Sequence, residues 1–366
     1  MGRQAAKVSS ADLERLCVEP DRLLKEAVLS MDRSRLGIVL VVDGQRRLVG
    51  TITDGDIRRA MLARIGLDQP LRLLLDRKAD TPYARPITAP VGADPSLYLA
   101  LLKAHGVLHL PLVDEESRVV GLVTMDEFLP EEPLSLHAVV MAGGKGSRLH
   151  PLTENLPKPM LPIGDRPLLE IIIRQLSEAG IRHVKVATHH KPEKIEAYFQ
   201  DGSRFGVELT YVEEDQPLGT GGGLSLMGRP DQPTLVINGD ILTEVDFRAM
   251  LAFHKEHRAD LTVAVRHYDI QVPYGVVECE GAAVRGISEK PVMGFFVNAG
   301  IYLLDPIVYQ HIPSGQRFDM TDLIQRLIAE GCSVVSFPIR EYWLDIGEHA
   351  EYERAQQDVS EGKVKV

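Results

Sequence analysis

Residues 136–149 read LHAVVMAGGKGSRL, and this stretch decides the fold of the larger part of the chain. Leu136–Met141 is a short apolar run of the kind that forms a buried parallel strand. Glycines follow it, so the backbone N–H groups of Ala142–Leu149 can approach a phosphate closely. Arg148 adds a forked cation that suits phosphate oxygens. The stretch predicts an α/β domain with an anion-binding loop at a strand end.

The spacing of the glycines excludes two common phosphate loops. The dinucleotide fingerprint G-x-G-x-x-G fails because Leu149 stands where the third glycine belongs. A Walker loop fails because the chain contains no G-x-x-x-x-G-K-[ST]. A nicotinamide-dependent oxidoreductase is therefore disfavoured.

Beyond this loop the sequence alternates between helix and strand patterns. Pro167–Ala179 carries apolar residues at i, i+4 spacing, and Gly180 suits its end, which predicts a helix. Further strands are predicted at Val184–Thr188, Thr234–Asn238, Leu261–Val265 and Ala299–Leu303. The alternation predicts an α/β domain over residues 136–366 with a mainly parallel sheet.

The front of the chain, residues 1–130, contains an internal repeat. The paired segments are Gly37–Asp43 with Leu48–Ile57, and Leu108–Asp114 with Val119–Phe128. Each copy predicts a strand, a tight turn, a strand and then a helix with Thr53 or Thr124 at its N-cap. The proline-bearing segment 130–133 predicts a linker at 131–135 between the two halves.

The run from Ala142 continues through Pro151–Thr153 and Pro157–Ile163, where two prolines hold Lys158 in an extended segment. This whole run, Ala142–Ile163, resembles the loop of sugar-1-phosphate nucleotidylyltransferases. The resemblance extends over residues 136–350 and implies a Rossmann-like, GT-A-type fold. It implies a reaction that joins a nucleoside triphosphate to a sugar 1-phosphate and releases pyrophosphate. No nucleophilic side chain is needed, because the attacking phosphate is already an anion.

Site residues follow from this resemblance motif by motif. Arg148, Lys158 and Lys290 would neutralise phosphate charge, and Asp240 and Asp345 would hold Mg²⁺, which prefers carboxylates, phosphate oxygens and water. The nucleotide would contact Ala142, Gly143, Gly144, Gly146 and Ser147 in the first loop and Leu218, Gly219, Thr220 and Gly222 in a second. The sugar would contact Tyr274, Gly275, Glu289, Asn298 and Gly300.

The base and the sugar are less closely defined. Leu218–Gly223 resembles the loop of guanylyltransferases, which favours GTP, and dTTP, UTP, CTP and ATP remain alternatives. Glucosamine, mannose or a heptose would each suit the family. A non-catalytic nucleotide-sensing subunit of the same fold is disfavoured, because every charged residue of the implied site is present.

The repeat at the front resembles a tandem CBS module of α+β type. In that family, Gly-x-x-Thr-x-x-Asp places a hydroxyl and a carboxylate near a ribose and a phosphate. The first copy matches with Gly50, Thr53 and Asp56, whereas the second has Thr124 followed by Glu127. The resemblance implies an adenine nucleotide as regulator, or else a ligand-free platform for dimers, and similar CBS-containing enzymes make GDP-glucosamine for nonulosonic acids of the cell surface. Either role leads us to expect a homodimer.

Charge and cysteine content limit the other classes of function. The formal net charge is −11, and no basic stripe for nucleic acid or an anionic membrane is present. The three cysteines, Cys17, Cys279 and Cys332, are scattered and predict neither a disulfide framework nor a zinc site. The N-terminal residues lack the apolar core of a signal peptide, and we expect a cytoplasmic protein.

Overall fold

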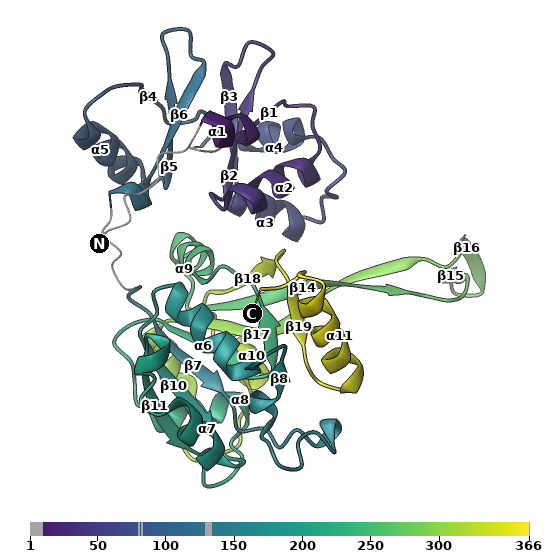
Figure 1. Ribbon diagram of the computed structural model, residues 1–366. Coiled ribbons are helices and arrows are strands. Elements are labelled where there is room, and N and C mark those ends of the chain that lie inside the picture. Colours follow the sequence, from purple (N-terminus) through teal and green to yellow (C-terminus); the bar gives the residue numbers. More distant parts are fainter. Residues whose placement is uncertain (1–9, 80, 82, 129–133, 366) are drawn as a thin grey trace. The chain divides into compact units, whose positions relative to one another are not determined.

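The computed structural model describes residues 10–79, 81, 83–128 and 134–365 (Figure 1). The chain divides into two compact units, Met1–Glu132 and Pro133–Val366. Residues 129–133, which include most of the predicted linker, lie outside the described residues.

The first unit is built from two small sheets with the same design. In each sheet a short parallel strand and an antiparallel hairpin partner flank the middle strand, in the orders β1-β2-β3 and β4-β5-β6. The elements are α1 Ser10–Leu16, β1 Cys17–Val18, α2 Leu24–Ser34, β2 Ile38–Val42, β3 Leu48–Thr53, α3 Asp54–Leu62, α4 Leu71–Lys78, β4 Ala89–Pro90, α5 Pro95–His105, β5 His109–Val113, β6 Val119–Thr124 and η1 Met125–Glu127. The predicted repeat is confirmed by this topology.

Both hairpin turns depend on an aspartate. The carboxylate of Asp43 accepts hydrogen bonds from the N–H groups of Gln45 and Arg47, and Asp114 does the same for Glu116 and Arg118. Such side-chain bonds fix tight turns between β-branched strands. The second copy differs from the prediction at its end, where a single 3₁₀ turn, η1, follows β6 in place of a helix.

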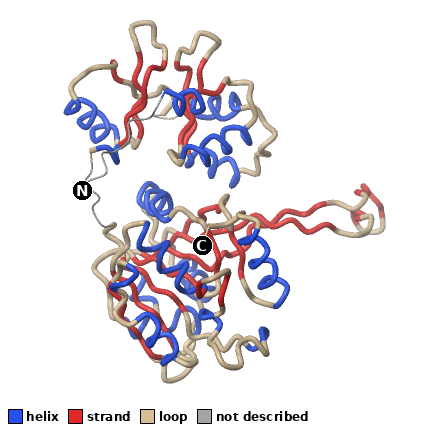
Figure 2. The backbone as a smooth tube through the Cα atoms, viewed as in Figure 1, coloured by secondary structure: helices blue, strands red, loops and turns tan. Residues whose placement is uncertain are grey.

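The second unit is a seven-stranded sheet of order β11-β10-β7-β12-β17-β14-β18 (Figures 1 and 2). The strands are β7 His137–Met141, β10 His183–Thr188, β11 Glu208–Glu213, β12 Thr234–Asn238, β14 Leu261–Gln271, β17 Val292–Leu304 and β18 Val334–Ile339. Only β17 runs antiparallel to its neighbours, so the sheet is mainly parallel. The predicted α/β class is confirmed.

Helices and short ribbons complete this unit. The helices are α6 Leu168–Glu178, α7 Pro192–Phe199, α8 Gly219–Gly222, α9 Phe247–Glu256, α10 Met320–Ala329 and α11 His349–Ser360, with 3₁₀ turns η2 Ser147–Leu149, η3 Lys158–Met160, η4 Ser203–Phe205, η5 Gly223–Met227 and η6 Pro306–His311. The ribbons pair β8 Pro162–Ile163 with β9 Arg166–Pro167, β13 Ile241–Thr243 with β19 Trp343–Asp345, and β15 Val276–Glu280 with β16 Ala283–Ser288. Helix α10 packs Leu323 and Leu327 against the buried side chains of β12, β14 and β17. The predicted helix at 167–179 is α6, with Pro167 at its N-cap.

Strands β14 and β17 extend beyond the sheet as a two-stranded arm that carries β15 and β16 at its tip (Figure 1). Pairing is continuous from Val265↔Asn298 to Gln271↔Val292, whereas β18 pairs with β14 only as far as Arg266. At about 3.3 Å per residue, this free part of the ribbon is about 20 Å long. The sequence analysis predicted only the inner parts of both strands.

Among the described residues, the structure contains no helix that combines the length and apolar character needed to span a membrane.

Candidate active site

The site begins where β7 and β12 end next to one another. The two strands are parallel, with Asn238 paired with Met141, so the loops after them start side by side. The N–H of Gly239 donates to the Met141 carbonyl over 2.9 Å, and a Cβ at residue 239 would lie 2.9 Å from that same oxygen. A side chain there would force the loops apart, so glycine is required for the next residue, Asp240, to reach the first loop.

The predicted metal ligands, Asp240 and Asp345, lie side by side although they are far apart in the chain. The ribbon of β13 and β19 pairs Ile241 with Asp345, and the Ile346 N–H donates to the Asp240 carbonyl over 3.0 Å. Both carboxylates therefore face the carboxyl end of the sheet, where α/β folds bind ligands.

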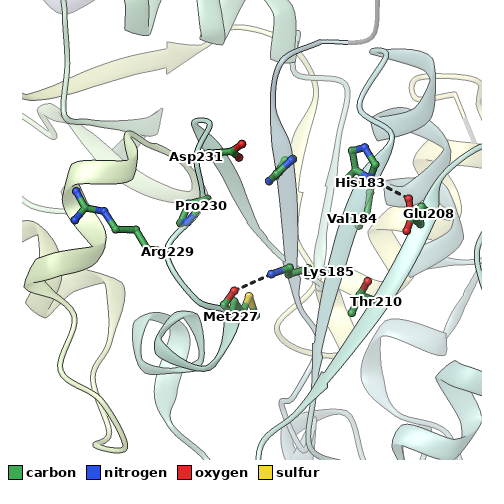
Figure 3. A pocket seen from close by; sticks show the side chains of 10 residues that line it. His183, Val184, Lys185, Glu208, Thr210, Met227, Arg229, Pro230 and Asp231 are labelled. Carbon is green, nitrogen blue, oxygen red and sulfur yellow. Dashed lines mark hydrogen bonds and ion pairs between the residues drawn. The ribbon is translucent and has the colours of Figure 1, made fainter.

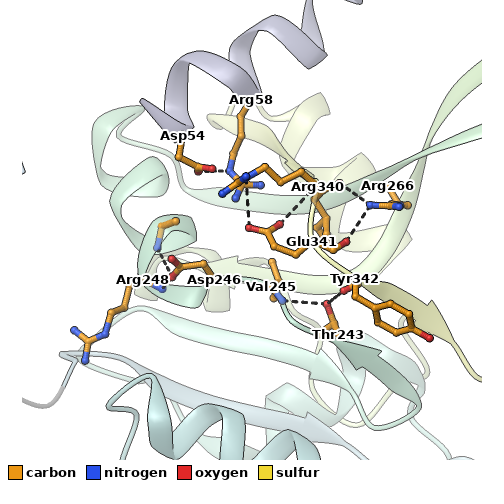
Figure 4. A network of polar contacts seen from close by, with 12 residues as sticks. Asp54, Arg58, Thr243, Val245, Asp246, Arg248, Arg266, Arg340, Glu341 and Tyr342 are labelled. Carbon is orange, nitrogen blue, oxygen red and sulfur yellow. Dashed lines mark hydrogen bonds and ion pairs between the residues drawn. The ribbon is translucent and has the colours of Figure 1, made fainter. Parts of the chain in front are cut away.

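Backbone contacts anchor the segment that leads into Asp345 (Figure 4). The Arg266 guanidinium donates to the carbonyls of Ile339 and Glu341 over 3.2 and 3.0 Å. From the other side, the Thr243 hydroxyl donates to the Tyr342 carbonyl over 2.8 Å. Strand β19 is therefore fixed at both edges before it presents Asp345.

Lys158 neutralises part of the charge of this pair. Its ammonium lies 2.5 Å from Oδ2 of Asp240, and the lysine is buried between the prolines that hold it. Burial raises the pKa of Asp345, and the Asp240 charge raises it further, while Lys158 and Arg148 oppose the shift. Burial and the Asp240 charge thus outweigh the two nearby cations in their effect on this pKa.

A magnesium ion fits this donor set. Oδ1 of Asp240 is buried and has no hydrogen-bond partner in the structure, which leaves a costly unpaired acceptor. The described residues contain no group of three or more histidine, cysteine or acidic side chains arranged to hold a metal. Two carboxylates with the remaining positions left to phosphates and water are typical of Mg²⁺ rather than of a protein-enclosed cation.

The glycine-rich loop wraps round Lys158. Gly146 has φ +63°, and a Cβ there would lie 2.9 Å from Cγ2 of Thr153 and 3.0 Å from Cβ of Lys158. The Thr153 hydroxyl fixes the turn by donating to the Gly146 carbonyl over 2.8 Å. Arg148 follows on the 3₁₀ turn η2 that begins at Ser147, with an exposed guanidinium 3.7 Å from the Glu348 carboxylate. The cation is therefore free to turn toward a phosphate.

Earlier in the same loop, the strand end is tied down and the glycines are open. The Ala142 N–H donates to the Ala187 carbonyl of β10 over 2.8 Å. A Cβ on Gly143 would lie 3.3 Å from Cβ of His189, whereas Gly144 faces open space. The structure therefore places Ala142 beside the turn that leads to Asp240 and Gly146 against Lys158, which pairs with Asp240, whereas Gly143 lies nearer to His189 and Glu214.

The second predicted nucleotide loop, Leu218–Gly223, is held by groups that the sequence analysis did not single out. The Thr220 N–H donates to Asp319, while its hydroxyl accepts from the Met320 N–H at the start of α10. A Cβ on Gly219 would lie 2.4 Å from that Asp319 carboxylate, and one on Gly222 would lie 2.7 Å from the Gln316 carbonyl. These contacts explain the glycines of this loop and orient it toward β7.

Glu214 was also missed by the sequence analysis. It is buried, burial raises its pKa, and its carboxylate accepts from the Leu218 N–H over 3.1 Å. A Cβ on Gly223 would lie 2.4 Å from its other oxygen. A lone glutamate after a strand has no spacing signal, whereas Asp319 was detectable from the capping pattern that it forms with Asp322.

Two predicted sugar residues, Asn298 and Gly300, lie at the base of the arm, close to the end of β12 and the turn that contains Asp240. The Gly300 N–H donates to the Asn298 side chain over 3.0 Å, and a Cβ on Gly300 would lie 2.7 Å from Nδ2 of Asn238. The Trp343 indole donates to the Ala299 carbonyl over 2.9 Å, which connects this region to β19. The structure brings these two residues to the carboxylate pair.

The other sugar-side residues are not brought there within one chain. Tyr274, Gly275, Glu289 and Lys290 lie beyond Gln271↔Val292, at the outer end of the arm (Figure 1). They are close to one another, since a Cβ on Gly275 would lie 3.0 Å from the Glu289 carboxylate. The physical reason is the unbroken ladder of the arm, which holds them roughly 20 Å from Asn298.

In the first unit, the predicted ligand residues act as helix caps. Asp56 receives hydrogen bonds from the N–H and hydroxyl of Thr53, and its carboxylate also lies 2.9 Å from Lys78 and 2.7 Å from Arg59. Thr124 and Glu127 form the matching capping box over 2.9 Å. A cavity of about 290 Å³ lies beside Lys78 and is also lined by Gly50, Thr51, Tyr83 and Arg85.

A separate cavity of about 480 Å³ lies at the opposite end of the sheet (Figure 3). Its lining comes from the starts of β7, β10 and β11, with His137, His183 and Glu208, and from the segment Met227–Asp231 before β12. None of the predicted site residues lines it. Ligands of open α/β sheets bind at the other end, beyond the carboxyl ends of the strands.

The fold and the site together are those of a nucleotidyltransferase domain. The family model described as nucleotidyl transferase matches residues 137–362, and the chain belongs to this family. Residues 11–63 and 87–131 match the CBS domain, in agreement with the two similar sheets of the first unit.

Curated relatives resemble about three fifths of the chain. A mannose-1-phosphate guanylyltransferase of Mycobacterium tuberculosis is 36% identical over 233 residues, which are 62% of this chain and 65% of that protein. A UTP–glucose-1-phosphate uridylyltransferase of Synechocystis is 32% identical over 251 residues, 63% of this chain and 65% of that protein. The chain thus spans less than two thirds of the length of these relatives.

One solved structure shares the fold over a similar fraction of this chain. It is a Bacillus anthracis protein that carries the name of a glucose-1-phosphate thymidylyltransferase, in complex with sucrose. The TM-score is 0.51 at 25% identity, over 61% of this chain and 94% of that one.

Proposed function

We propose that this protein transfers a nucleoside monophosphate, from GTP by preference, to a sugar 1-phosphate and releases pyrophosphate. The observation that carries the proposal is the pair of carboxylates, Asp240 and Asp345, presented beside a glycine-rich loop with Lys158 against them. This arrangement provides for the charge of two substrates that are both anions and supplies no nucleophile of its own.

The chain's own groups have separate tasks in this reaction. Asp240 and Asp345 would hold a magnesium ion, which supplies positive charge to the nucleotide and sugar phosphates. Lys158, fixed by its buried segment and paired with Asp240, would help to stabilise the charge that builds on the departing pyrophosphate. Arg148 is exposed and would neutralise the charge that builds on the departing pyrophosphate. Positioning of the two substrates and neutralisation of their charge would together account for the acceleration of the reaction.

GTP is favoured by the Leu218–Gly223 loop and by the guanylyltransferases among the relatives. UTP is the second candidate, because a uridylyltransferase is also similar to this chain. Pyrophosphate release should be measured with GTP, UTP, dTTP, CTP and ATP, each with magnesium and a panel that includes mannose, glucosamine, glucose and heptose 1-phosphates. Release with GTP supports the proposal in full, and release with another nucleotide revises the base alone.

Absence of release with every combination would favour a non-catalytic sensor of the same fold. The Asp240→Asn protein is the matched control, since asparagine keeps the size of the side chain and removes its charge. Any release that persists in this variant does not come from the proposed site.

For the first unit, we propose that the cavity beside Lys78 binds an adenine nucleotide as a regulator, in a cytoplasmic enzyme. Lys78 and Arg85 would face its phosphates, while Asp56, which accepts hydrogen bonds from Thr53, positions Lys78. Binding of AMP and ATP should be measured by calorimetry on the full chain and on Lys78→Ala. Equal binding by both proteins would place the nucleotide elsewhere.

A further inference from the structure

The arm has an exposed apolar surface that its own chain leaves open. On one face the paired residues Tyr268 and Phe295, and Ile270 and Met293, stand next to one another. At the tip, Val277, Val284 and Ile287 share a face of the β15–β16 hairpin. These seven residues, called the apolar strip below, are 44–71% exposed.

The size of the apolar strip indicates a protein partner. At 55% and 44% exposure, Tyr268 and Phe295 alone present roughly 150–250 Å² of apolar surface, and the five aliphatic side chains add to it. A standard interface buries about 800 Å² on each partner. An isolated two-stranded ribbon is also only marginally stable in water, so this arm gains stability from being covered.

The arm does not have the geometry to cover the site of its own chain. Its ladder of pairs is unbroken from Val265↔Asn298 to Gln271↔Val292, and the irregularity in β14 lies further inside, between Val263 and Val265. Folding back would break these pairs. At the outer end, Lys290 is exposed and has φ +45°, a conformation that non-glycine residues adopt only when their surroundings demand it.

The candidate active site, in turn, needs a cation on its sugar side. In one chain, Lys158 is paired with Asp240, and Arg148 lies against Glu348 on the side of the nucleotide loop. A sugar 1-phosphate that approaches the carboxylate pair beside Asn298 therefore needs an additional cation. Lys290, with Glu289 next to it to accept hydrogen bonds from sugar hydroxyls, provides the matching chemistry at the end of the arm.

We propose that two copies of this chain exchange arms, so that the apolar strip packs on the second copy and Lys290 and Glu289 of each chain complete the sugar side of the other chain's site. In a closed two-fold dimer the strip of each chain contacts the same part of the other chain, so both strips are covered at once. This inference rests on the proposed function only for the role of Lys290 and Glu289, and not for the dimer itself.

Complementation between two inactive variants tests the exchange. Asp240→Asn chains and Lys290→Ala chains, each with its own tag, are expressed together, and mixed dimers are purified through both tags. Each parent should lose activity about 100-fold. The mixed dimer keeps one intact site, which combines the Asp240 of one chain with the Lys290 of the other, and should show about half of the wild-type rate. A mixed dimer as inactive as its parents overturns the exchange while the proposed function stands.

The dimer has a test of its own. Tyr268→Ser with Phe295→Ser should yield monomers by sedimentation, whereas Ile328→Ser, which removes an equally exposed apolar side chain from α10, should remain dimeric. Wild-type chains that sediment as monomers overturn the proposal.

If wild-type protein releases no pyrophosphate with any substrate, the proposed function fails and a cross-link decides the exchange. The two partners would be Lys290→Cys in one chain and Glu348→Cys in the other, both with the exposed Cys279 changed to serine. A short bismaleimide that joins the two chains supports the exchange, and its failure to join them overturns it.

Discussion

The Asp345→Asn substitution tests whether the Asp345 carboxylate has a functional or a structural role. The substitution keeps the shape of the side chain and removes one of the two negative charges of the site. A charge contact of this kind contributes about 3 kcal/mol to lowering the barrier, so pyrophosphate release should fall ~100-fold or more. Among the described residues, Asp345 has no ion-pair partner through which it would hold the fold, whereas Asp240 holds Lys158.

The same substitution should leave the metal-free protein no less stable. Burial and the neighbouring charge of Asp240 raise the pKa of Asp345, which means that its ionised form is disfavoured in the folded state. Removal of this charge should therefore increase the free energy of unfolding, by less than about 1 kcal/mol because the cleft is open to screening solvent.

Two assays test the role of Asp345. Pyrophosphate release is measured at saturating magnesium, and urea unfolding is measured in EDTA. Turnover within tenfold of wild type would refute the assignment of Asp345 as a metal ligand. A loss of more than 2 kcal/mol in EDTA, which is far outside the expected change, would show that its role is structural instead.

Three further predictions concern neighbouring groups. Lys158→Met should abolish turnover and also reduce the free energy of unfolding by about 3–5 kcal/mol, since it leaves Asp240 partly buried without its partner; unchanged urea unfolding would contradict the ion pair. Gly239→Ala should cost about 1–3 kcal/mol, because its Cβ would lie 2.9 Å from the Met141 carbonyl, and Gly144→Ala, in open space, is the control with little effect on unfolding. The raised pKa of Asp345 means that, in EDTA, the folded state still binds this proton at a pH where the unfolded state has released it. The free energy of unfolding should therefore fall as pH rises above the ordinary pKa of 3.8. Asp345→Asn should lose this part of the pH dependence.

The inner sheet was predictable from the sequence because its strands are buried on both faces. Thr234–Asn238 was predicted with the bounds that the structure has, and Val184–Thr188 differs by one residue. A continuous apolar run bounded by turn residues carries enough information for such strands. The first glycine-rich loop was predictable from its glycines, and the structure shows that packing requires one of them, since a Cβ on Gly146 would lie 2.9 Å from Cγ2 of Thr153.

The arm was not predictable in the same way. Strand β14 continues for six residues beyond the predicted Leu261–Val265, through Arg266–Gln271, where charged and aromatic residues replace the apolar run. From His267 on, these residues are exposed, so no buried apolar run marks them as a strand. The alternation of Tyr268 and Ile270 with polar residues was the available signal, and the sequence analysis did not use it. The outer positions of Glu289 and Lys290 follow from this extension. The resemblance, which does not include the extension, implied that both residues belong to the site.

The front unit shows a different limit. A Thr-x-x-Asp pattern satisfies a helix N-terminus and a ribose equally well, and only the partners of Asp56 distinguish the two roles. The structure gives that carboxylate two cations and two hydrogen bonds from Thr53, which occupy its oxygens.

The pairing of β13 with β19 sets the order in which the site is assembled during synthesis. Asp240 and Asp345 are about a hundred residues apart, so a ribosome working at about 5–20 residues per second releases the second carboxylate some 5–20 s after the first. Until β19 emerges and pairs with β13, a nascent chain has its glycine loop and Lys158 but only one carboxylate. A chain cut short before residue 343 would therefore fold much of the sheet and remain unable to turn over substrate, however much nucleotide it met.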